Sequence, residues 1–391
     1  MTKVKYPLAE RLSQLPPYLF AAIDRLKQEA RDRGVDIIDL GIGDPDLPTP
    51  KHIIENLNQS VWKSTNHRYP SYEGLLAFRQ AVATWYEKRF QVKLDAKTEV
   101  LSLIGSKEGI GHFPMAFINP GDKVLIPDPG YPVYRAGTIF AQGIPVILPL
   151  LKKNNFLPDL KALTSEQLTE AKIIFLNYPN NPTAATANLA FFQEIVGLAK
   201  RYGLIVCHDA AYSEIYFNNQ PPLSFLETPG AKEVGIEFHS LSKTYNMTGW
   251  RIGFAVGNAE VLSGLGKIKT NLDSGIFQAI QEAGIAALEG DQTCVSNMTK
   301  IYQERRDVLI NGLKQIGLAV DVPQATFYVW ISTPPGYSST QAALHLLDKA
   351  GVVCTPGIGF GQSGESYLRM TLTVDKERIK EAIELIKRVG F

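Results

Sequence analysis

The sequence predicts an α/β protein with a buried, largely parallel sheet between helices. Two observations predict this class. The first is a set of seven short apolar runs, which are typical of strands covered on both faces: 100–104, 123–126, 145–148, 173–176, 204–207, 235–238 and 252–256. The second is that helical periodicity separates most of these runs, as in Gly74 to Phe90 and Leu189 to Tyr202. Short strands alternating with helices indicate crossover-connected parallel strands.

The two ends of the chain have a different pattern of expected helices and strands. A helix is expected from Tyr18 to Arg33, stopped by Gly34 and followed by a β-rich run, 35–40. After residue 290 we expect helices at 291–316, 339–349 and 375–388 and strands at 326–331 and 367–372, with one face of the last helix formed by Ile379, Ala382, Ile383 and Ile386. We therefore predict a large domain at 45–290 and a smaller α+β domain at 291–391. The N-terminal segment, 1–44, is expected to join the smaller domain because it cannot bury a core alone.

Composition excludes several classes of protein. Of 391 residues, 45% are apolar and 20% are charged, as in an average globular chain. The net charge of +1 offers no basic field for nucleic acid or an anionic membrane. No apolar stretch of about 18 residues is available to span a bilayer, and no signal peptide is visible. Cys207, Cys294 and Cys354 fit neither a zinc site nor a disulfide framework. We expect a cytoplasmic protein without a bound metal.

A lysine motif is the strongest local signal for chemistry. Lys243 follows a predicted strand, with Ser240 and Ser242 before it and Arg251 eight residues after it. A lysine that forms an imine must lose its proton readily, and burial with neighbouring positive charge lowers its pKa. The two serines and the arginine suit one phosphate group. The alternative is a solvated lysine in a polar surface loop.

Two further motifs end predicted strands of the sheet. Asp209 ends one strand, where α/β folds place functional groups, and Tyr212 follows three residues later. An aspartate there can pair with a protonated ring nitrogen, although it could simply cap the next helix. Asn181 follows the preceding strand between two prolines, which restrict the backbone around it. The alternative for Asn181 is an ordinary β-turn.

A glycine turn and a buried arginine complete the set of candidates. Gly105 and Ser106 lie where a strand turns into a helix, whose free N–H groups can bind phosphate. Such turns are frequent, so this motif is weak alone. Arg369 lies on a strand between apolar neighbours, and its planar guanidinium matches a carboxylate in two-point geometry. The alternative is a structural ion pair.

In order and spacing these motifs resemble the class I/II aminotransferases, which are fold-type I pyridoxal 5′-phosphate enzymes. The resemblance covers essentially the whole chain, from residues 40–46 to Arg369. It implies a mostly parallel seven-stranded sheet in the large domain and makes Lys243 the Schiff-base lysine. Asp209 would pair with the pyridinium nitrogen, Tyr212 and Asn181 with the ring O3′, and Tyr131 would stack on the ring.

The resemblance also implies the remaining contacts. The residues that would hold the phosphate are Gly105, Ser106, Lys107, Ser240, Ser242 and Arg251. Arg369 would bind the substrate α-carboxylate, with Asn181 and the Gly43 backbone nearby. Tyr69 would reach across a homodimer to the partner's cofactor, and Tyr72 is a candidate second contact.

One position departs from the family pattern. The family usually has glycine after Asn-Asn-Pro-Thr, where this chain has Ala184. If the position needs a positive φ, alanine costs roughly 1 kcal/mol there.

Three stretches resemble the LL-diaminopimelate aminotransferase branch of the family: 38–50, 129–137 and 269–278. This implies a ping-pong exchange of an amino group with 2-oxoglutarate in lysine biosynthesis. Asn271 and Lys269 are candidates to bind the far end of such a substrate, or they are ordinary loop residues.

Three other functions stay open at this point. One is an aspartate- or alanine-type aminotransferase of broader specificity. Another is a carbon–sulfur lyase on the same fold, because the cofactor makes the carbanion and the pocket decides its fate. The last is a transcription factor with an aminotransferase-like domain, which the small N-terminal segment and the near-neutral charge disfavour.

Overall fold

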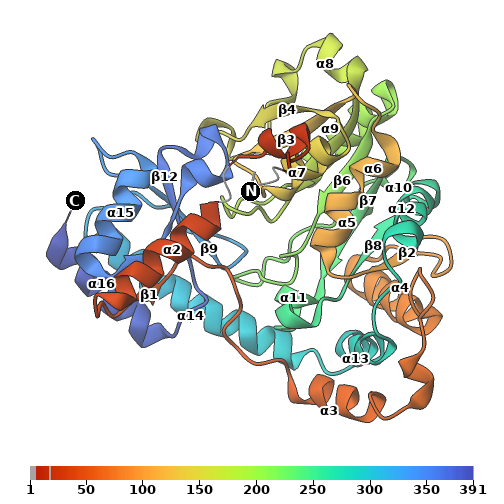
Figure 1. Ribbon diagram of the computed structural model, residues 1–391, viewed down its shortest axis with the longest axis horizontal. Helices are drawn as coiled ribbons and strands as arrows, with labels where there is room; N and C mark the ends of the chain where they lie inside the picture. Colours follow the sequence, from red (N-terminus) through yellow and green to blue (C-terminus); the bar gives the residue numbers. More distant parts are fainter. Residues whose placement is uncertain (1–5, 17–18, 391) are drawn as a thin grey trace, which may run out of the picture.

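The computed structural model describes residues 6–16 and 19–390, which form two lobes (Figure 1). The larger lobe contains a seven-stranded sheet in the order β2-β8-β7-β6-β5-β3-β4. Its strands are β2 (Val100–Leu103), β3 (Lys123–Asp128), β4 (Ile144–Pro149), β5 (Ala171–Asn177), β6 (Ile205–Asp209), β7 (Gly235–Ser240) and β8 (Gly253–Gly257). Only β8 is antiparallel to its two neighbours. All seven apolar runs are strands, which confirms the predicted fold class.

Helices cover both faces of this sheet because its strands are apolar on both sides. Along β5, Ile174 and Leu176 face one core cluster, while Ile173 and Phe175 face the other. The helices of this lobe are α3 (Lys51–Ser60), α4 (Leu76–Phe90), α5 (Ser106–His112), α6 (Pro114–Phe117), α7 (Val133–Phe140), α8 (Ser165–Glu170), α9 (Leu189–Tyr202), α10 (Ala231–Val234), α11 (Leu241–Thr244), α12 (Ala259–Leu272) and α13 (Gln278–Glu289).

The smaller lobe combines both ends of the chain. Its elements are α2 (Leu19–Asp32), β1 (Ile38–Asp39), α14 (Thr293–Gln315), β9 (Tyr328–Ser332), α15 (Ser339–Ala350), β10 (Val352–Val353), β11 (Thr355–Pro356), β12 (Tyr367–Thr371) and α16 (Lys376–Val389). Strand β1 pairs with β10, and β12 lies between β11 and β9. Ile38 and Leu40 share one core cluster with Ile379 and Ile383 of α16. This shared core supports our proposal that the N-terminal segment belongs to the smaller domain.

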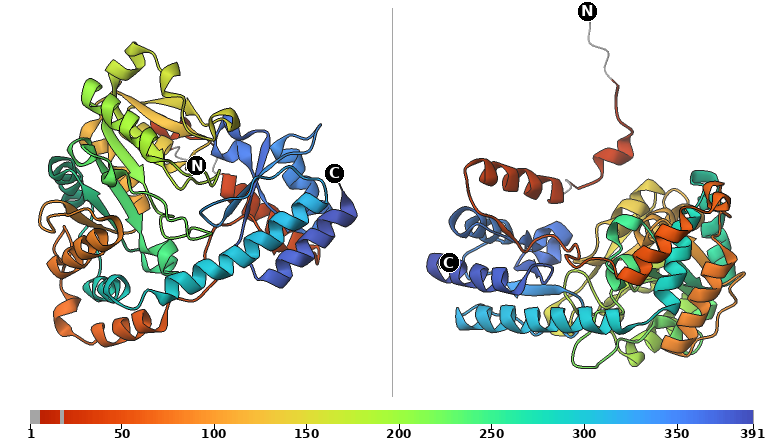
Figure 2. Two further views of the ribbon diagram at one scale, coloured as in Figure 1. Left: turned by 180° about the vertical axis from the view of Figure 1, so that it is seen from behind. Right: turned by 90° about the horizontal axis from the view of Figure 1, so that it is seen from below.

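Several predicted boundaries differ from the structure. The run at 35–40 contributes only the two residues of β1, and the strand expected at 326–331 is β9, two residues later at its start. Tyr18, the predicted start of the first helix, lies outside the described residues. Residues 6–14, including α1 (Glu10–Ser13), extend away from the lobes (Figure 2), whereas Leu15 and Pro16 line a hollow of the large lobe. Within the described ranges, no helix has the length and apolar character needed to cross a membrane.

Candidate active site

A cavity of about 220 Å³ lies at the carboxyl edge of the sheet. Strands β5, β6 and β7 are parallel, so their ends bring Asn177, Asp209 and Ser240 to the same edge. The lining residues are Asp44, Ser106, Lys107, Tyr131, Asn177, Asn181, Asp209, Ala211, Tyr212, Ser240, Ser242, Lys243, Thr248 and Arg251. The fold therefore gathers most of the predicted site residues, which are far apart in the sequence, around one space.

Lys243 enters the cavity from the short helix α11, just after β7. Its Nζ donates a hydrogen bond to the carbonyl oxygen of Gly43 at 3.2 Å. Burial is the main cause that lowers the pKa of Lys243 to about 8; the negative charge of Asp44 opposes this shift, and the positive charges of Arg251 and Arg369 add to it. This amine is therefore much closer to its neutral, nucleophilic form at pH 7 than an ordinary lysine.

Asp209 is a buried carboxylate at the end of β6. Its Oδ2 accepts a hydrogen bond from the Tyr134 hydroxyl at 2.7 Å, and its Oδ1 accepts one from the Ala211 amide at 3.3 Å. Burial raises the pKa of Asp209, and the two hydrogen bonds oppose that rise. No helix follows directly, so Asp209 is not a helix cap. Among the described residues it forms no ion pair, so a cationic ring nitrogen in the cavity would give it a partner.

Sequence reasoning missed Tyr134. It lies on α7, three residues after Tyr131, and its buried hydroxyl donates to Asp209. A buried tyrosine needs a hydrogen-bond partner, and the spacing from Tyr131 was the signal that could have found it. The contact fixes the orientation of the Asp209 carboxylate.

Hydroxyl and guanidinium donors also line the cavity. They belong to Ser106, Ser240, Ser242 and Arg251. Gly105 has φ +74°, and a Cβ there would overlap the Arg251 guanidinium. The cradle therefore depends on glycine at position 105. One arginine with three hydroxyls is a donor set that suits a phosphate group.

Arg369 reaches toward the large lobe from β12. Its side chain is only 2% exposed. Its Nη1 donates to Asn181 Oδ1 and its Nη2 donates to the Gly41 carbonyl, both at 2.8 Å. The Arg369 guanidinium lies 4.2 Å from the centre of the Tyr328 ring. These contacts aim a buried cation at the junction of the two lobes.

Tyr328 on β9 is a second residue that sequence reasoning missed. Its hydroxyl lies 3.0 Å from the hydroxyl of Tyr212. A Cβ on Gly43 would overlap the Tyr328 ring, so the loop around Gly43 can lie here only because position 43 lacks a side chain. Tyr328 thus packs against three predicted site residues, Tyr212, Gly43 and Arg369. Its place in an apolar strand gave no sign of these contacts.

Gly43, Gly105 and Arg369 border the cavity through contacts with its lining residues Lys243, Arg251 and Asn181. Four other predicted residues do not line the cavity of their own chain. Tyr69 is 87% exposed and Tyr72 is 46% exposed. Asn271 and Lys269 lie on helix α12, so their description as loop residues is wrong. Asn271 donates to the Lys267 carbonyl, and the buried Lys269 pairs with Glu108 and Asp273. Within one chain, neither residue is placed to contact a ligand in the cavity.

Ala184 adopts the left-handed conformation that the family pattern suggested, with φ +61°. The left-handed conformation costs an L-residue about 1–2 kcal/mol of folded-state stability. Glycine avoids this strain, but the greater conformational entropy of its unfolded chain lowers the free energy of unfolding by about 0.4–1 kcal/mol. We expect Ala184→Gly to raise the free energy of unfolding by about 0.5–1 kcal/mol, measured by urea denaturation. The matched control is Ala286→Gly inside helix α13, which should lower it by a similar amount. A destabilised Ala184→Gly protein would contradict this account.

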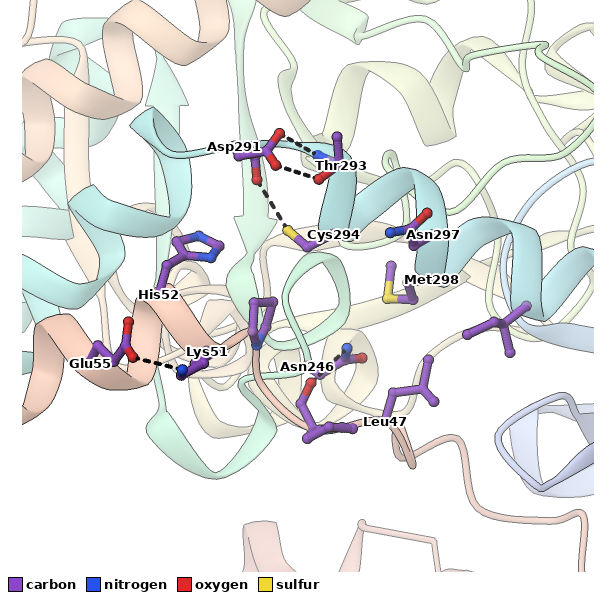
Figure 3. Close-up of a pocket in the computed structure, with 13 residues that line it drawn as sticks. Leu47, Lys51, His52, Glu55, Asn246, Asp291, Thr293, Cys294, Asn297 and Met298 are labelled. Atoms are coloured by element: carbon purple, nitrogen blue, oxygen red, sulfur yellow. Dashed lines mark hydrogen bonds and ion pairs between the residues drawn. The ribbon is translucent and has the colours of Figure 1, made fainter.

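A separate hollow of about 600 Å³ lies between the starts of α3 and α14 (Figure 3). His52, Asn246, Cys294 and Met298 are among its lining residues. It contains none of the predicted site residues. In the described part of the chain, no group of histidine, cysteine and acidic side chains is arranged to hold a metal ion.

The arrangement defines a class of enzyme. A lysine of lowered pKa, a buried carboxylate and a phosphate cradle share one cavity, as an enzyme with a phosphorylated, ring-bearing aldehyde cofactor requires. Residues 35–386 match the family described as aminotransferase class I and II, and the chain belongs to this family. Enzymes of this family depend on pyridoxal 5′-phosphate (PLP), so the protein is a PLP-dependent aminotransferase.

Similar proteins cover the chain almost from end to end. It is 60% identical to an LL-diaminopimelate aminotransferase from Syntrophobacter fumaroxidans, over 98% of this chain and 99% of that protein. It is 58% identical to an enzyme of the same name from Maridesulfovibrio salexigens, over 98% of this chain and 100% of that protein. The substrate-bound structure of BacF from Bacillus subtilis superposes with a TM-score of 0.95 at 35% identity, and 98% of each chain is covered.

Proposed function

We propose that the protein transfers an amino group between LL-diaminopimelate and 2-oxoglutarate by a ping-pong mechanism in lysine biosynthesis. The observation that carries transamination is one cavity that combines the Lys243 amine with the Asp209 carboxylate. The names of the relatives at 58–60% identity support the diaminopimelate substrate. The free thiols Cys207, Cys294 and Cys354 favour a reducing compartment such as the cytoplasm.

In this proposal each residue of the site contacts a different part of PLP. Asp209 would pair with the ring nitrogen, Tyr212 and Asn181 with the ring oxygen, and Tyr131 would stack on the ring. The phosphate would be held by Gly105, Ser106, Lys107, Ser240, Ser242 and Arg251. When bound, PLP withdraws electrons from the substrate and makes its Cα–H acidic.

The side chains of this chain then orient the substrate and move its proton. Arg369 would bind the substrate α-carboxylate, and the Gly43 backbone carbonyl orients the Lys243 amine within the cavity. With the cofactor bound, Lys243 would take the proton from the substrate Cα as a general base and return it as a general acid. Asp209 would supply the negative charge that keeps a ring nitrogen protonated, and the Tyr134 hydroxyl keeps this carboxylate in place.

The space next to the cavity fits a long substrate with charges at its far end. A hollow of about 910 Å³ shares Lys107, Tyr131 and Arg251 with the cavity. Its lining is mostly apolar, but Glu108 and Arg135 place charges of both signs in it. A distal amino-acid group carries both charges, so these two side chains suit diaminopimelate better than alanine. Lys269 supports this wall by its ion pair with Glu108.

A panel of amino donors tests the substrate assignment. Each donor is added to the PLP-loaded enzyme without a keto acid, and the loss of the cofactor's visible absorbance is followed in a single turnover. We expect LL-diaminopimelate and glutamate to react fast, with meso-diaminopimelate, aspartate and alanine slower. Faster reaction with aspartate or alanine would favour an aminotransferase of broader specificity. Sustained release of ammonia without a keto acid would instead identify a lyase.

The pKa of Lys243 predicts a pH dependence for cofactor capture. Only the neutral amine attacks the aldehyde, so lowering the pKa increases the reactive fraction at neutral pH. With a pKa of about 8, roughly one amine in ten is neutral at pH 7, against roughly one in 3,000 for an ordinary lysine. We expect the rate of PLP capture by the apoprotein to rise with pH and level off above about pH 8. A rate that keeps rising toward pH 10.5 would contradict this pKa.

We also propose a homodimer in which Tyr69 completes the partner's site. Tyr69 is 87% exposed and does not line the cavity of its own chain, which supports a role toward a second copy. Loss of a hydrogen bond to a charged phosphate should weaken PLP binding about 10- to 100-fold in Tyr69→Phe.

Hybrid dimers test this arrangement directly. A dimer of one Tyr69→Phe chain and one Lys243→Ala chain would contain one fully native site. Mixing the two variants should therefore restore tight PLP binding and turnover in part of the population. A monomeric protein, or Tyr69→Phe with unchanged PLP affinity, would contradict the proposed dimer.

A further inference from the structure

A buried carboxylate that lines the larger hollow joins the two lobes. Asp128 ends strand β3 of the large lobe. Its Oδ1 accepts a hydrogen bond from the Ser363 amide at 2.8 Å, and its Oδ2 accepts one from the Gln362 amide at 3.1 Å. Close by, the Gly130 amide donates to the Phe360 carbonyl at 2.8 Å. Three hydrogen bonds therefore fasten the end of β3 to one turn of the small lobe.

That turn is shaped to receive the carboxylate. It consists of two short 3₁₀ helices, η6 (Gly357–Phe360) and η7 (Gln362–Gly364), on either side of Gly361. Gly361 has φ +132°, and a Cβ there would overlap the Asp128 carboxylate. Both the backbone conformation and the close approach require glycine at this position. Glycine at position 361 therefore makes room for the Asp128 carboxylate as well as forming the turn.

The same turn carries a contact of Arg369. The Arg369 guanidinium lies 4.6 Å from the centre of the Phe360 ring and 4.2 Å from the centre of the Tyr328 ring. Phe360 is the residue whose carbonyl is bound by Gly130, next to the glycine that touches Asp128. The turn that Asp128 holds therefore packs on the guanidinium and helps to place it, beside the direct hydrogen bond from Arg369 to Asn181.

We propose that Asp128 is a positioning residue for substrate binding, which acts through Phe360 on Arg369. The inference rests on the proposed function, in which Arg369 binds the substrate α-carboxylate. Without the carboxylate at position 128, two backbone amides lose their acceptor and the turn moves with the small lobe. The guanidinium is then less often in the position that binds the substrate α-carboxylate. The KM for substrate rises, whereas the proton transfers at Lys243 and the affinity for PLP stay unchanged.

The test compares Asp128→Ala and Asp128→Asn with a matched control. In Asp128→Ala we expect the KM for the amino donor and for 2-oxoglutarate to rise about 10- to 100-fold, the loss expected for hydrogen bonds to a charged group. We expect kcat to stay within about threefold and the Kd for PLP to stay unchanged. Asp128→Asn keeps one acceptor oxygen, so its KM values should lie between those of the native enzyme and those of Asp128→Ala. The control is Asp122→Asn near the other end of β3, where the carboxylate also accepts a backbone amide, from Asn119 at 2.9 Å.

A second variant covers the case in which Asp128→Ala does not fold. Gly361→Ala leaves Asp128 intact but forces the turn away from it, so it should give the same rise in KM with kcat preserved. A fall in kcat with unchanged KM, or weaker PLP binding, in the folded variants would overturn the proposal.

Arg369→Lys, measured in parallel, separates the proposed role of Arg369 in substrate binding from the proposed positioning role of Asp128. If Arg369→Lys leaves KM unchanged, the proposed role of Arg369 is wrong. If Arg369→Lys raises KM and the Asp128 and Gly361 variants do not, the positioning role is wrong. If Asp128 acts through Arg369, the Asp128→Asn/Arg369→Lys double variant should have a KM close to that of Arg369→Lys alone. If the KM of the double variant instead rises by the product of the two single fold-increases, the residues act independently, which would contradict the proposal.

Discussion

Lys243→Ala should lose turnover almost completely, with kcat falling by about four orders of magnitude. In the proposed mechanism the same amine holds the cofactor, removes the Cα proton and returns it, and a positioned general acid–base alone contributes about 10²–10⁴ in rate. The variant should still bind PLP through the donors around Arg251, but without the visible absorbance that a covalent link to lysine gives the cofactor. Steady-state turnover with LL-diaminopimelate and the absorbance spectrum are the two measurements.

Lys267→Ala is the control for this change. Lys267 is an exposed residue on helix α12, so removing its amine should leave both turnover and the spectrum unchanged. A Lys243→Ala protein with normal turnover would remove the basis for the catalytic assignment.

Asp209→Asn should give the second largest loss, about a thousandfold in kcat. A negative charge about 4 Å from a protonated ring nitrogen is worth about 4 kcal/mol at an effective dielectric constant of 20. This energy corresponds to about three powers of ten in rate. The amide preserves the size of the side chain and a contact for the Tyr134 hydroxyl, so the loss reports on charge. kcat with saturating substrate is the quantity to measure.

The spectrum of Asp209→Asn separates catalysis from binding. The cofactor should still be linked to Lys243, because the phosphate donors and the lysine are intact, whereas the ring nitrogen should lose its proton at neutral pH. Asp122→Asn again serves as the control for a carboxylate outside the site. Asp209→Asn with more than a tenth of the native kcat would contradict the role given to this carboxylate.

Local patterns predicted most of the fold because local physical chemistry decides it. Helix α9 matches its predicted range of Leu189 to Tyr202, because Asn188 caps its first turn and Gly203 ends it with φ +69°. The strands of the large sheet were predictable because burial on both faces leaves continuous apolar runs. Strand β1 was overestimated because its two residues depend on β10, which is more than 300 residues away in the sequence.

The site was predictable only where strand ends carry unusual polar residues. Lys243, Asp209 and Asn181 follow apolar strands and stood out for that reason. Tyr134 and Tyr328 did not, because a tyrosine within an apolar segment is indistinguishable from core until its hydroxyl partner is known. Asp128 lies in a proline- and glycine-rich segment, and its partners are amides of a turn more than 230 residues away.

Chemical trapping of the cofactor tests the central claim most directly. The PLP-loaded enzyme is reduced with borohydride, which makes the bond between cofactor and lysine permanent, and the digested protein is mapped by mass spectrometry. The account predicts one pyridoxyl group per chain, on the peptide that contains Lys243. Modification of Lys107, Lys269 or another lysine instead, or recovery of unmodified Lys243 from a fully loaded enzyme, would contradict it.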